Sequence, residues 1–259
     1  KTKKINLALN TIQFKLDLKK ISLFLETENP KIIFKNVSLP IQNIKIYIDF
    51  LPILKSDLKI RKINLILEEL DIAKLNKLSA IIKPSNFKNI LKNKVKKGKL
   101  ISEIEIFLNE EGVLENFISR GSVTGSEIQL LSNINLSEIK FSFFADKNDI
   151  LFKNIFGNID DIKIVDGDLK LNLEDGIKIN SNFDANINLD HKPLNKYQKF
   201  FTKYKFTKNI KSLKANLNNN IFIDLDKTYK LRDYNYKILG KLITENEIVL
   251  NEEGVLENF

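Results

Sequence analysis

Few side chains in this 259-residue chain have a type and spacing that could carry out chemistry. His191 is the only histidine and there is no cysteine, so disulfides and thiolate zinc sites are excluded. No glycine pattern that binds phosphate or presents a catalytic serine occurs. His191 follows Asp190 at the start of a lysine-rich segment, where a surface or capping role suits it better than catalysis. The sequence therefore predicts a protein that is not an enzyme and holds no cofactor.

The acidic clusters are better explained as turns than as metal sites. Aspartates gather at residues 146–149, 160–161 and 166–168, within hydrophilic stretches. Calcium loops need oxygen ligands at a fixed spacing that ends in a bidentate glutamate, and none of these clusters completes that pattern. Asp and Asn readily hydrogen-bond their own backbone in turns. We therefore expect turns at these positions and no bound metal.

The net charge of +9 does not indicate a nucleic-acid partner. Lysines concentrate in the first hundred residues, whereas residues 101–190 are acidic, and Arg61, Arg120 and Arg232 are the only arginines. Base readout relies heavily on arginine, and lysine clusters alone give salt-sensitive, unspecific binding. The lysines between residues 88 and 99 suit lipid headgroups better, provided that the neighbouring surface is apolar.

Alternation of apolar and polar residues dominates the chain and is typical of strands with one apolar face. Short spacings between the alternating runs favour antiparallel hairpins, with turns expected at residues 109–112, 166–167 and 175–176. Protein partners cannot be inferred from such a pattern. The side chains expected to line the apolar face are Ile44, Ile46, Ile48, Phe50, Ile104, Ile106, Leu108, Ile139, Phe141, Phe143, Leu169, Leu171, Leu173, Ile187 and Leu189.

The number of expected strands limits the shape that the sheet can take. About fifteen candidates exceed what an open twisted sheet holds without curling, splitting or closing. A sandwich, a closed barrel and a trough remain. A trough would expose its apolar side chains, and acyl chains would cover them at about 0.8 kcal/mol per buried methylene.

Two segments, residues 83–97 and 191–208, break the alternation and carry apolar residues at helical spacing, with lysines on another face. Their ordinary explanation is a short amphipathic helix packed across the sheet, and the alternative is a helix resting on an anionic membrane surface. We expect β segments at residues 1–82, 98–190 and 209–259 on either side of these helices.

Residues 98–117 and 240–259 form an internal repeat in which only three of the 20 positions differ. Each copy runs from a strand into an Asn-Glu-Glu-Gly turn, which is typical of an architecture extended by similar units. A recent duplication and an artefact of sequence assembly would both explain the near-identity. The chain begins at Lys1 and contains no methionine, which predicts an internal fragment of a longer protein.

Two stretches of the chain resemble the AsmA-like proteins. Residues 51–54 (LPIL) follow a strand and lead into Ile60, Ile63 and Leu65, similar to the "leucine-proline-leucine-leucine" turn and "I-x-x-I-x-L" strand of that family. Residues 98–173 resemble the central region of its YhdP branch. Residues 121–125 (GSVTG) match its "G-x-V-x-G" element and are followed by strands at residues 128–130 and 139–143.

This resemblance implies a fold and a function. AsmA-like proteins, including the YhdP and TamB types, are similar to bridge-like lipid transfer proteins, with a long, taco-shaped apolar β-groove. The resemblance implies a periplasmic protein, anchored in the inner membrane by a segment outside these residues, that moves phospholipid toward the outer membrane.

Together, the residues and the resemblance predict a mainly β protein with a long, curved antiparallel sheet and two short amphipathic helices. Its expected partners are phospholipid acyl chains and, through the basic helices, a membrane surface. The alternative is a structural or scaffold β protein, a closed sandwich or a solenoid, without a lipid ligand.

Overall fold

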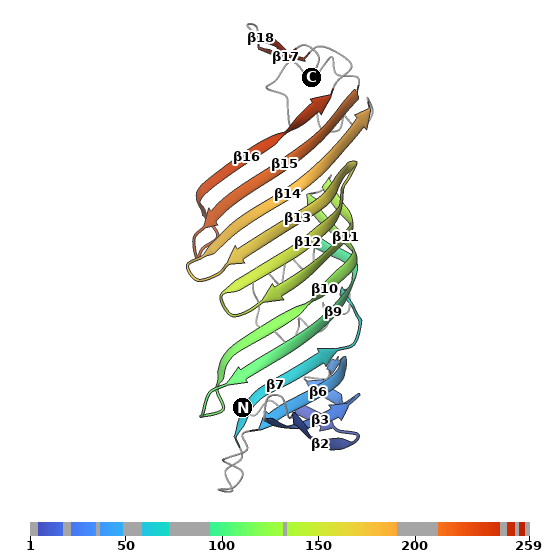
Figure 1. The fold of residues 1–259 in the computed structure, drawn as a ribbon, viewed down its shortest axis with the longest axis vertical. Helices are drawn as coiled ribbons and strands as arrows, with labels where there is room; N and C mark the ends of the chain where they lie inside the picture. Colours follow the sequence, from blue (N-terminus) through green and yellow to red (C-terminus); the bar gives the residue numbers. More distant parts are fainter. Residues whose placement is uncertain are drawn as a thin grey trace. The chain divides into compact units, whose positions relative to one another are not determined.

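The computed structural model describes residues 5–17, 22–34, 37–48, 59–72, 94–131, 134–190, 212–243, 248–251 and 254–256. Every regular element in these ranges is a β-strand, which confirms the expected mainly β class. Thirteen strands form one large sheet whose strand order is β16-β15-β14-β13-β12-β11-β10-β9-β7-β6-β3-β2, with β8 beside β9 (Figure 1). The contacts divide the chain into two compact units.

Unit 1 comprises Lys1–Ile128 and Ser142–Leu151. In it β2, β3, β6, β7, β9 and β10 pair antiparallel with one another in that order, while β1, β4 and β5 make a separate three-stranded sheet. The strands that lie in it wholly or largely are β1 (Ile5–Ala8), β2 (Ile12–Asp17), β3 (Ser22–Glu28), β4 (Lys31–Phe34), β5 (Val37–Leu39), β6 (Ile41–Ile48), β7 (Ile60–Leu67), β8 (Leu70–Asp71), β9 (Val95–Leu108) and β10 (Leu114–Leu131).

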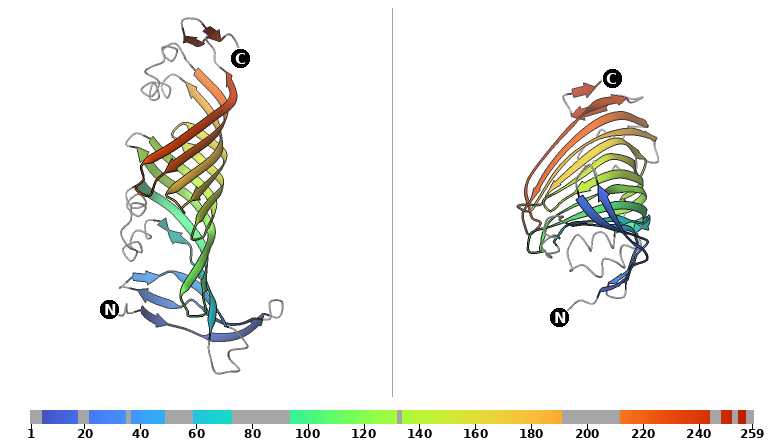
Figure 2. Two further views of the ribbon diagram at one scale, coloured as in Figure 1. Left: turned by 90° about the vertical axis from the view of Figure 1, so that its left-hand side faces the viewer. Right: turned by 60° about the horizontal axis from the view of Figure 1, so that its bottom comes forward.

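Unit 2 comprises Gln129–Phe141 and Phe152–Phe259. Strands β13 to β16 lie side by side in both views of Figure 2 and pair antiparallel in chain order. Its strands, of which the first two are shared with unit 1, are β11 (Ile134–Ala145), β12 (Asp149–Ile159), β13 (Ile162–Asn172), β14 (Ile177–Asp190), β15 (Ser212–Leu225), β16 (Leu231–Ile243), β17 (Ile248–Asn251) and β18 (Gly254–Leu256).

The Asn-Glu-Glu-Gly turn of the first repeat is confirmed. The Asn109 side-chain oxygen accepts hydrogen bonds from the backbone N–H groups of Glu111 (3.1 Å) and Val113 (2.8 Å), and Gly112 has a φ of 74°. Asparagine supplies the side-chain acceptor, and glycine adopts the left-handed conformation without strain. In the second copy β17 and β18 pair antiparallel, with Val249 opposite Val255.

The turn at residues 175–176 is also confirmed, whereas the one expected at residues 166–167 is wrong. Strand β13 continues through Asp166 and Gly167, which lie opposite Asp184 and Phe183 of β14. Pairing with a long neighbouring strand therefore overrides the local Asp-Gly signal. A β-carbon at position 167 would lie 3.0 Å from that of Phe183, so the glycine makes room for a side chain.

The helix expected at residues 83–97 is wrong at its end, because β9 begins at Val95. Val95 lies opposite Ile128, and Lys97 lies opposite Glu127 and forms a 2.8 Å ion pair with it. The β-branched Val95 and the cross-strand partners Ile128 and Glu127 favour a strand here, although the apolar residues have helical spacing. Residues 83–93 and the second expected helix, residues 191–208, lie outside the described ranges.

The two glycines of the GSVTG segment are needed for different reasons within β10. Gly125 has a φ of 59°, at an irregularity where the register between β9 and β10 shifts after Thr124. This irregularity is a β-bulge. At Gly121 a β-carbon would lie 2.0 Å from the Ile101 carbonyl oxygen and 3.0 Å from a ring carbon of Phe143.

We predict that Gly121→Ala lowers the free energy of unfolding by about 2–3 kcal/mol, because the added methyl group displaces backbone rather than a flexible side chain. Chemical denaturation of the variant measures the loss. Ser122→Ala, at the next position of the same strand, is the matched control and should change stability by well under that amount. Equal effects of the two substitutions would contradict the proposed clash.

Candidate functional site

The apolar residues of unit 1 line up across six strands. Ile46 of β6 lies opposite Leu25 of β3 and Ile63 of β7, and Ile63 lies opposite Ile106 of β9. Directly opposed residues in a sheet place their side chains on the same face. The row is completed by Phe14 on β2 and Phe117 on β10, giving Phe14, Leu25, Ile46, Ile63, Ile106 and Phe117 in succession. We call the surface that contains this row the apolar face of unit 1.

Neighbouring rows on this face contain most of the remaining predicted residues of unit 1. Ile44 is opposite Leu65, and Leu65 is opposite Ile104; Ile48 is opposite Leu23; and Leu108 extends the same side of β9. Phe143 also reaches this face. Its ring adjoins Gly121, and Gly121 lies opposite Ser102. Ser102 is two residues from Ile104 and therefore on the same side of β9. Phe50 lies outside the described residues. The structure thus brings together seven of the eight predicted residues that belong to this unit.

The side chains on this face differ in how much water they meet. Ile44 and Ile48 are buried, with 6% and 4% of their surface exposed, whereas Phe14 on the outermost strand is 73% exposed. Ile46, Ile63, Ile104 and Ile106 are half-buried. The middle of the face therefore contains apolar surface that the described part of the fold covers only partly.

Unit 2 has an apolar face of its own. Leu171 lies opposite Ile179, which lies opposite Ile223, and Leu169 lies opposite Ser181, which lies opposite Ile221. Ile187 and Leu189 follow on the same side of β14, opposite Ala215 and Leu213. Four of the predicted residues, Leu169, Leu171, Ile187 and Leu189, therefore share this surface, which we call the apolar face of unit 2.

The other three predicted residues occupy different surroundings. Ile139 is buried at 3% exposure beside Gly157, and the Phe141 ring meets the Phe152 ring edge-on at 5.3 Å. Leu173 lies just beyond the end of β13 and is exposed. Exposure at a strand end makes Leu173 the weakest member of the predicted set.

Among the apolar residues absent from the sequence-based prediction, two sets on edge strands show clear alternation. Ile12, Phe14 and Leu16 belong to the apolar face of unit 1, and Tyr234, Tyr236 and Ile238 of β16 lie opposite Ile223, Ile221 and Asn219 on that of unit 2. Both sets occupy the terminal strands of the large sheet. Their period-two spacing was the signal that could have identified them.

The opposite side of unit 1, which we call its polar face, is a network of paired charges. Glu26 accepts hydrogen bonds from the Lys15 ammonium group and from Asn43 Nδ2 (2.9 Å), and Lys45 Nζ lies 3.4 Å from it. Arg120 bridges Glu103 (2.9 Å) and Glu105 (3.2 Å). These cross-strand pairs neutralise the acidic groups along the strands. A carboxylate paired in this way is poorly suited to act as a catalytic base.

The pairing changes the titration of Glu26 and Glu103. The Lys15 ammonium group, with Asn43 and Lys45, lowers the pKa of Glu26 to about 2 although burial opposes the shift. Arg120 and then Asn64 likewise lower the pKa of Glu103. A carboxylate that is ionised and paired at neutral pH stabilises the sheet and is poorly suited to accept a proton from a substrate.

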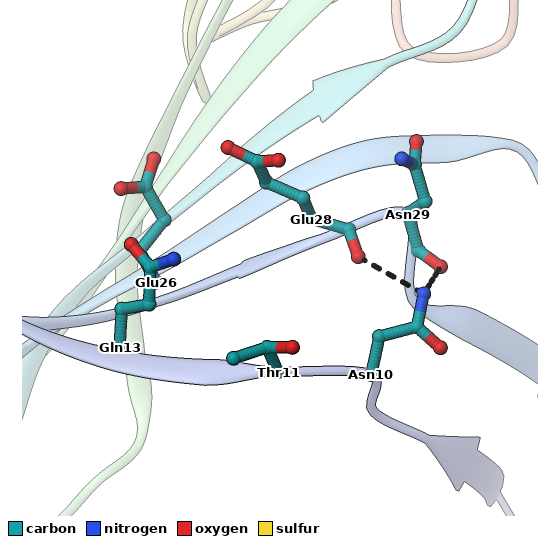
Figure 3. A pocket seen from close by; sticks show the side chains of 6 residues that line it. All are labelled: Asn10, Thr11, Gln13, Glu26, Glu28 and Asn29. Atoms are coloured by element: carbon teal, nitrogen blue, oxygen red, sulfur yellow. Dashed lines mark hydrogen bonds between the residues drawn. The ribbon is translucent and has the colours of Figure 1, made fainter.

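A small polar cavity of about 220 Å³ lies at one end of the polar face (Figure 3). Asn10 Nδ2 donates to the carbonyl oxygens of Asn29 (3.1 Å) and Glu28 (3.4 Å), which ties the start of β2 to the end of β3. Ligand pockets usually have volumes of about 300–1,000 Å³. The size and the internal hydrogen bonds make this cavity a structural feature of the β2–β3 hairpin.

Within the described ranges, no group of three acidic or histidine side chains could hold a metal ion, and no helix is long and apolar enough to cross a membrane. Comparisons with protein-family models, with curated proteins and with solved structures find no match to this chain. The two apolar faces are therefore the surfaces from which a function can be argued.

The low pKa of Glu26 gives a test of the polar face. A group whose folded-state pKa is depressed contributes stability that is present above its ordinary pKa of 4.5 and lost as the pH falls toward about 2. Lys15 is partly open to solvent, so screening limits the contribution to on the order of 1 kcal/mol. We predict that Glu26→Gln flattens the dependence of unfolding free energy on pH in this window, measured by urea denaturation at several pH values.

The matched control is Glu110→Gln, in an exposed turn, which should leave that dependence unchanged. The same pH profile for wild type and Glu26→Gln would show that the Lys15–Glu26 pair contributes nothing to folding.

Proposed function

We propose that this chain is a non-enzymatic lipid-binding protein whose apolar faces hold phospholipid acyl chains during transport between the bacterial inner and outer membranes. The observation that carries the proposal is the row from Phe14 to Phe117 on the apolar face of unit 1. Six strands at about 4.8 Å spacing make this row about 24 Å wide. Branched aliphatic and aromatic side chains throughout it offer no hydrogen bond to a polar ligand.

The energetics of apolar surfaces support a lipid as the ligand. Half-buried isoleucines across neighbouring strands form a patch that water solvates poorly, and such patches mark binding surfaces in soluble proteins. Each acyl methylene placed on the patch would gain about 0.8 kcal/mol. The paired charges lie on the opposite, polar face, so the sheet separates them from the acyl chains.

The finer features of the proposal come from the resemblance to AsmA-like proteins. They are a sheet curved into a groove, a periplasmic location, and anchoring in the inner membrane by a segment outside these residues. Transport would need no bond to be made or broken, since lipids would move along the surface down a gradient or under force from partner proteins.

Adjacent residues on β9 provide the sharpest test of the lipid-binding face. Ile106 lies on the apolar face and Phe107 on the polar face, opposite Lys62. We predict that Ile106→Asp lowers the amount of phospholipid that co-purifies with the chain by about tenfold or more, because a carboxylate beneath an acyl chain loses its hydration. Mass spectrometry of extracted lipids, per mole of protein, measures the effect.

Phe107→Asp is the matched control and should retain its phospholipid, and circular dichroism should show strand content equal to wild type in both variants. A photo-crosslinking residue at position 106 should also label phospholipid, and one at position 107 should not. Wild-type protein that carries no phospholipid would refute the proposal and favour a scaffold role.

A further inference from the structure

Strand β16 presents an open edge of the sheet. It pairs with β15 along one side, from Lys214 opposite Ile243 to Leu225 opposite Leu231, and no described strand pairs with its other side (Figure 1). Every residue from Leu231 to Lys241 is exposed. Backbone N–H and C=O groups along such an edge are a template for another strand.

The side chains at the centre of β16 divide between two faces. Tyr234 and Tyr236 lie on the apolar face of unit 2 and are 62% and 65% exposed. Asp233, Asn235 and Lys237 lie on the other face. Neither Asp233 nor Lys237 forms an ion pair with a described residue; Asp233 Oδ1 accepts only the neighbouring Tyr234 N–H, at 2.8 Å.

This arrangement is self-complementary when two copies meet antiparallel around Asn235. In that register Asp233 lies opposite Lys237 of the second copy, and Lys237 lies opposite Asp233 of the second copy. Tyr234 and Tyr236 pair in the same reciprocal way, and the two Asn235 residues face each other. Opposite charges and aromatic pairs directly across two strands are both stabilising.

We propose that β16 pairs with β16 of a second copy of this chain, forming a two-fold symmetric dimer with a sheet continuous across the two chains. A two-fold axis perpendicular to the sheet keeps the apolar faces of both copies on the same side and makes every contact twice. One pair of strands buries less area than stable interfaces do, so the dimer forms reversibly with concentration. This dimer does not depend on lipid binding.

The opposite edge of the sheet is a poorer candidate for self-pairing. Strand β2 has six residues against the thirteen of β16. Its lysine, Lys15, is already engaged with Glu26. The longer edge and the charges that can pair with a second copy are therefore both on β16.

Charge exchange tests the register. Asp233→Lys and Lys237→Asp each place like charges opposite each other twice, and each should weaken dimerisation by about tenfold in sedimentation equilibrium. The double variant Asp233→Lys/Lys237→Asp restores opposite charges and should return the dissociation constant to near that of wild type. Lys147→Asp, in an exposed turn, is the control for the change in net charge and should have no effect.

A cysteine cross-link tests the symmetry axis, because the chain has no cysteine of its own. In the proposed dimer the two residues at position 235 face each other with α-carbons about 4.5–5.5 Å apart, within reach of a disulfide. Asn235→Cys should therefore form a covalent dimer under mild oxidation. Lys241→Cys, exposed on the same strand, is the control, since its two copies would lie about 40 Å apart.

Three results would overturn the proposal. They are a wild-type chain that stays monomeric at every concentration, a double charge variant as weak as the single ones, and equal cross-linking at positions 235 and 241. Binding of lipid by a chain that does not dimerise would uphold the proposed function while refuting this dimer.

Discussion

Cross-strand register is the constraint on which the whole molecule depends. Side chains alternate between the two faces of a strand, so a slip of one residue would exchange the apolar and polar faces. In unit 1 the register places Ile46, Ile63 and Ile106 side by side, and it places Glu26 against Lys45 on the reverse. Apolar contact on one face and ion pairing on the other therefore favour the same alignment. A slip of one residue would lose both at once.

Bulges preserve this separation where the sequence departs from strict alternation. Between Ile60 and Ile63 the spacing is three residues, yet both lie on the apolar face because the register shifts at Arg61. In unit 2 Val165 has the same role: Ile162 and Ile164 precede it, Gly167 and Leu169 follow it, and all four share one face. One extra residue on a strand reverses the parity of everything beyond it. The bulges thus correct the pattern at the points where the sequence would otherwise turn apolar side chains toward the polar face.

The sequence predicts the strands well because their signal is local. Ile44, Ile46 and Ile48, or Ile104 and Ile106, can be assigned to one face from spacing alone, and the Asn109 turn carries its own side-chain acceptor. The errors arise where a distant partner decides the structure. Asp166 and Gly167 have the composition of a turn but are paired along β14, and Val95 leaves its helical pattern to pair with Ile128. Which rows become neighbours, and hence the existence of a continuous apolar face, also depends on pairings that no single segment encodes.

The order of strands from β9 to β16 follows the order of the chain, and its connections are short except between β14 and β15, where 21 residues intervene. Except at β15, each strand from β10 onward finds a partner in the segment just before it, so closing these hairpins costs little loop entropy. Sheets that depend on distant segments must wait for the whole chain, and they fold slowly for that reason. A meander with short turns can instead assemble progressively, one hairpin after another, while the rest of the polypeptide is still being synthesised.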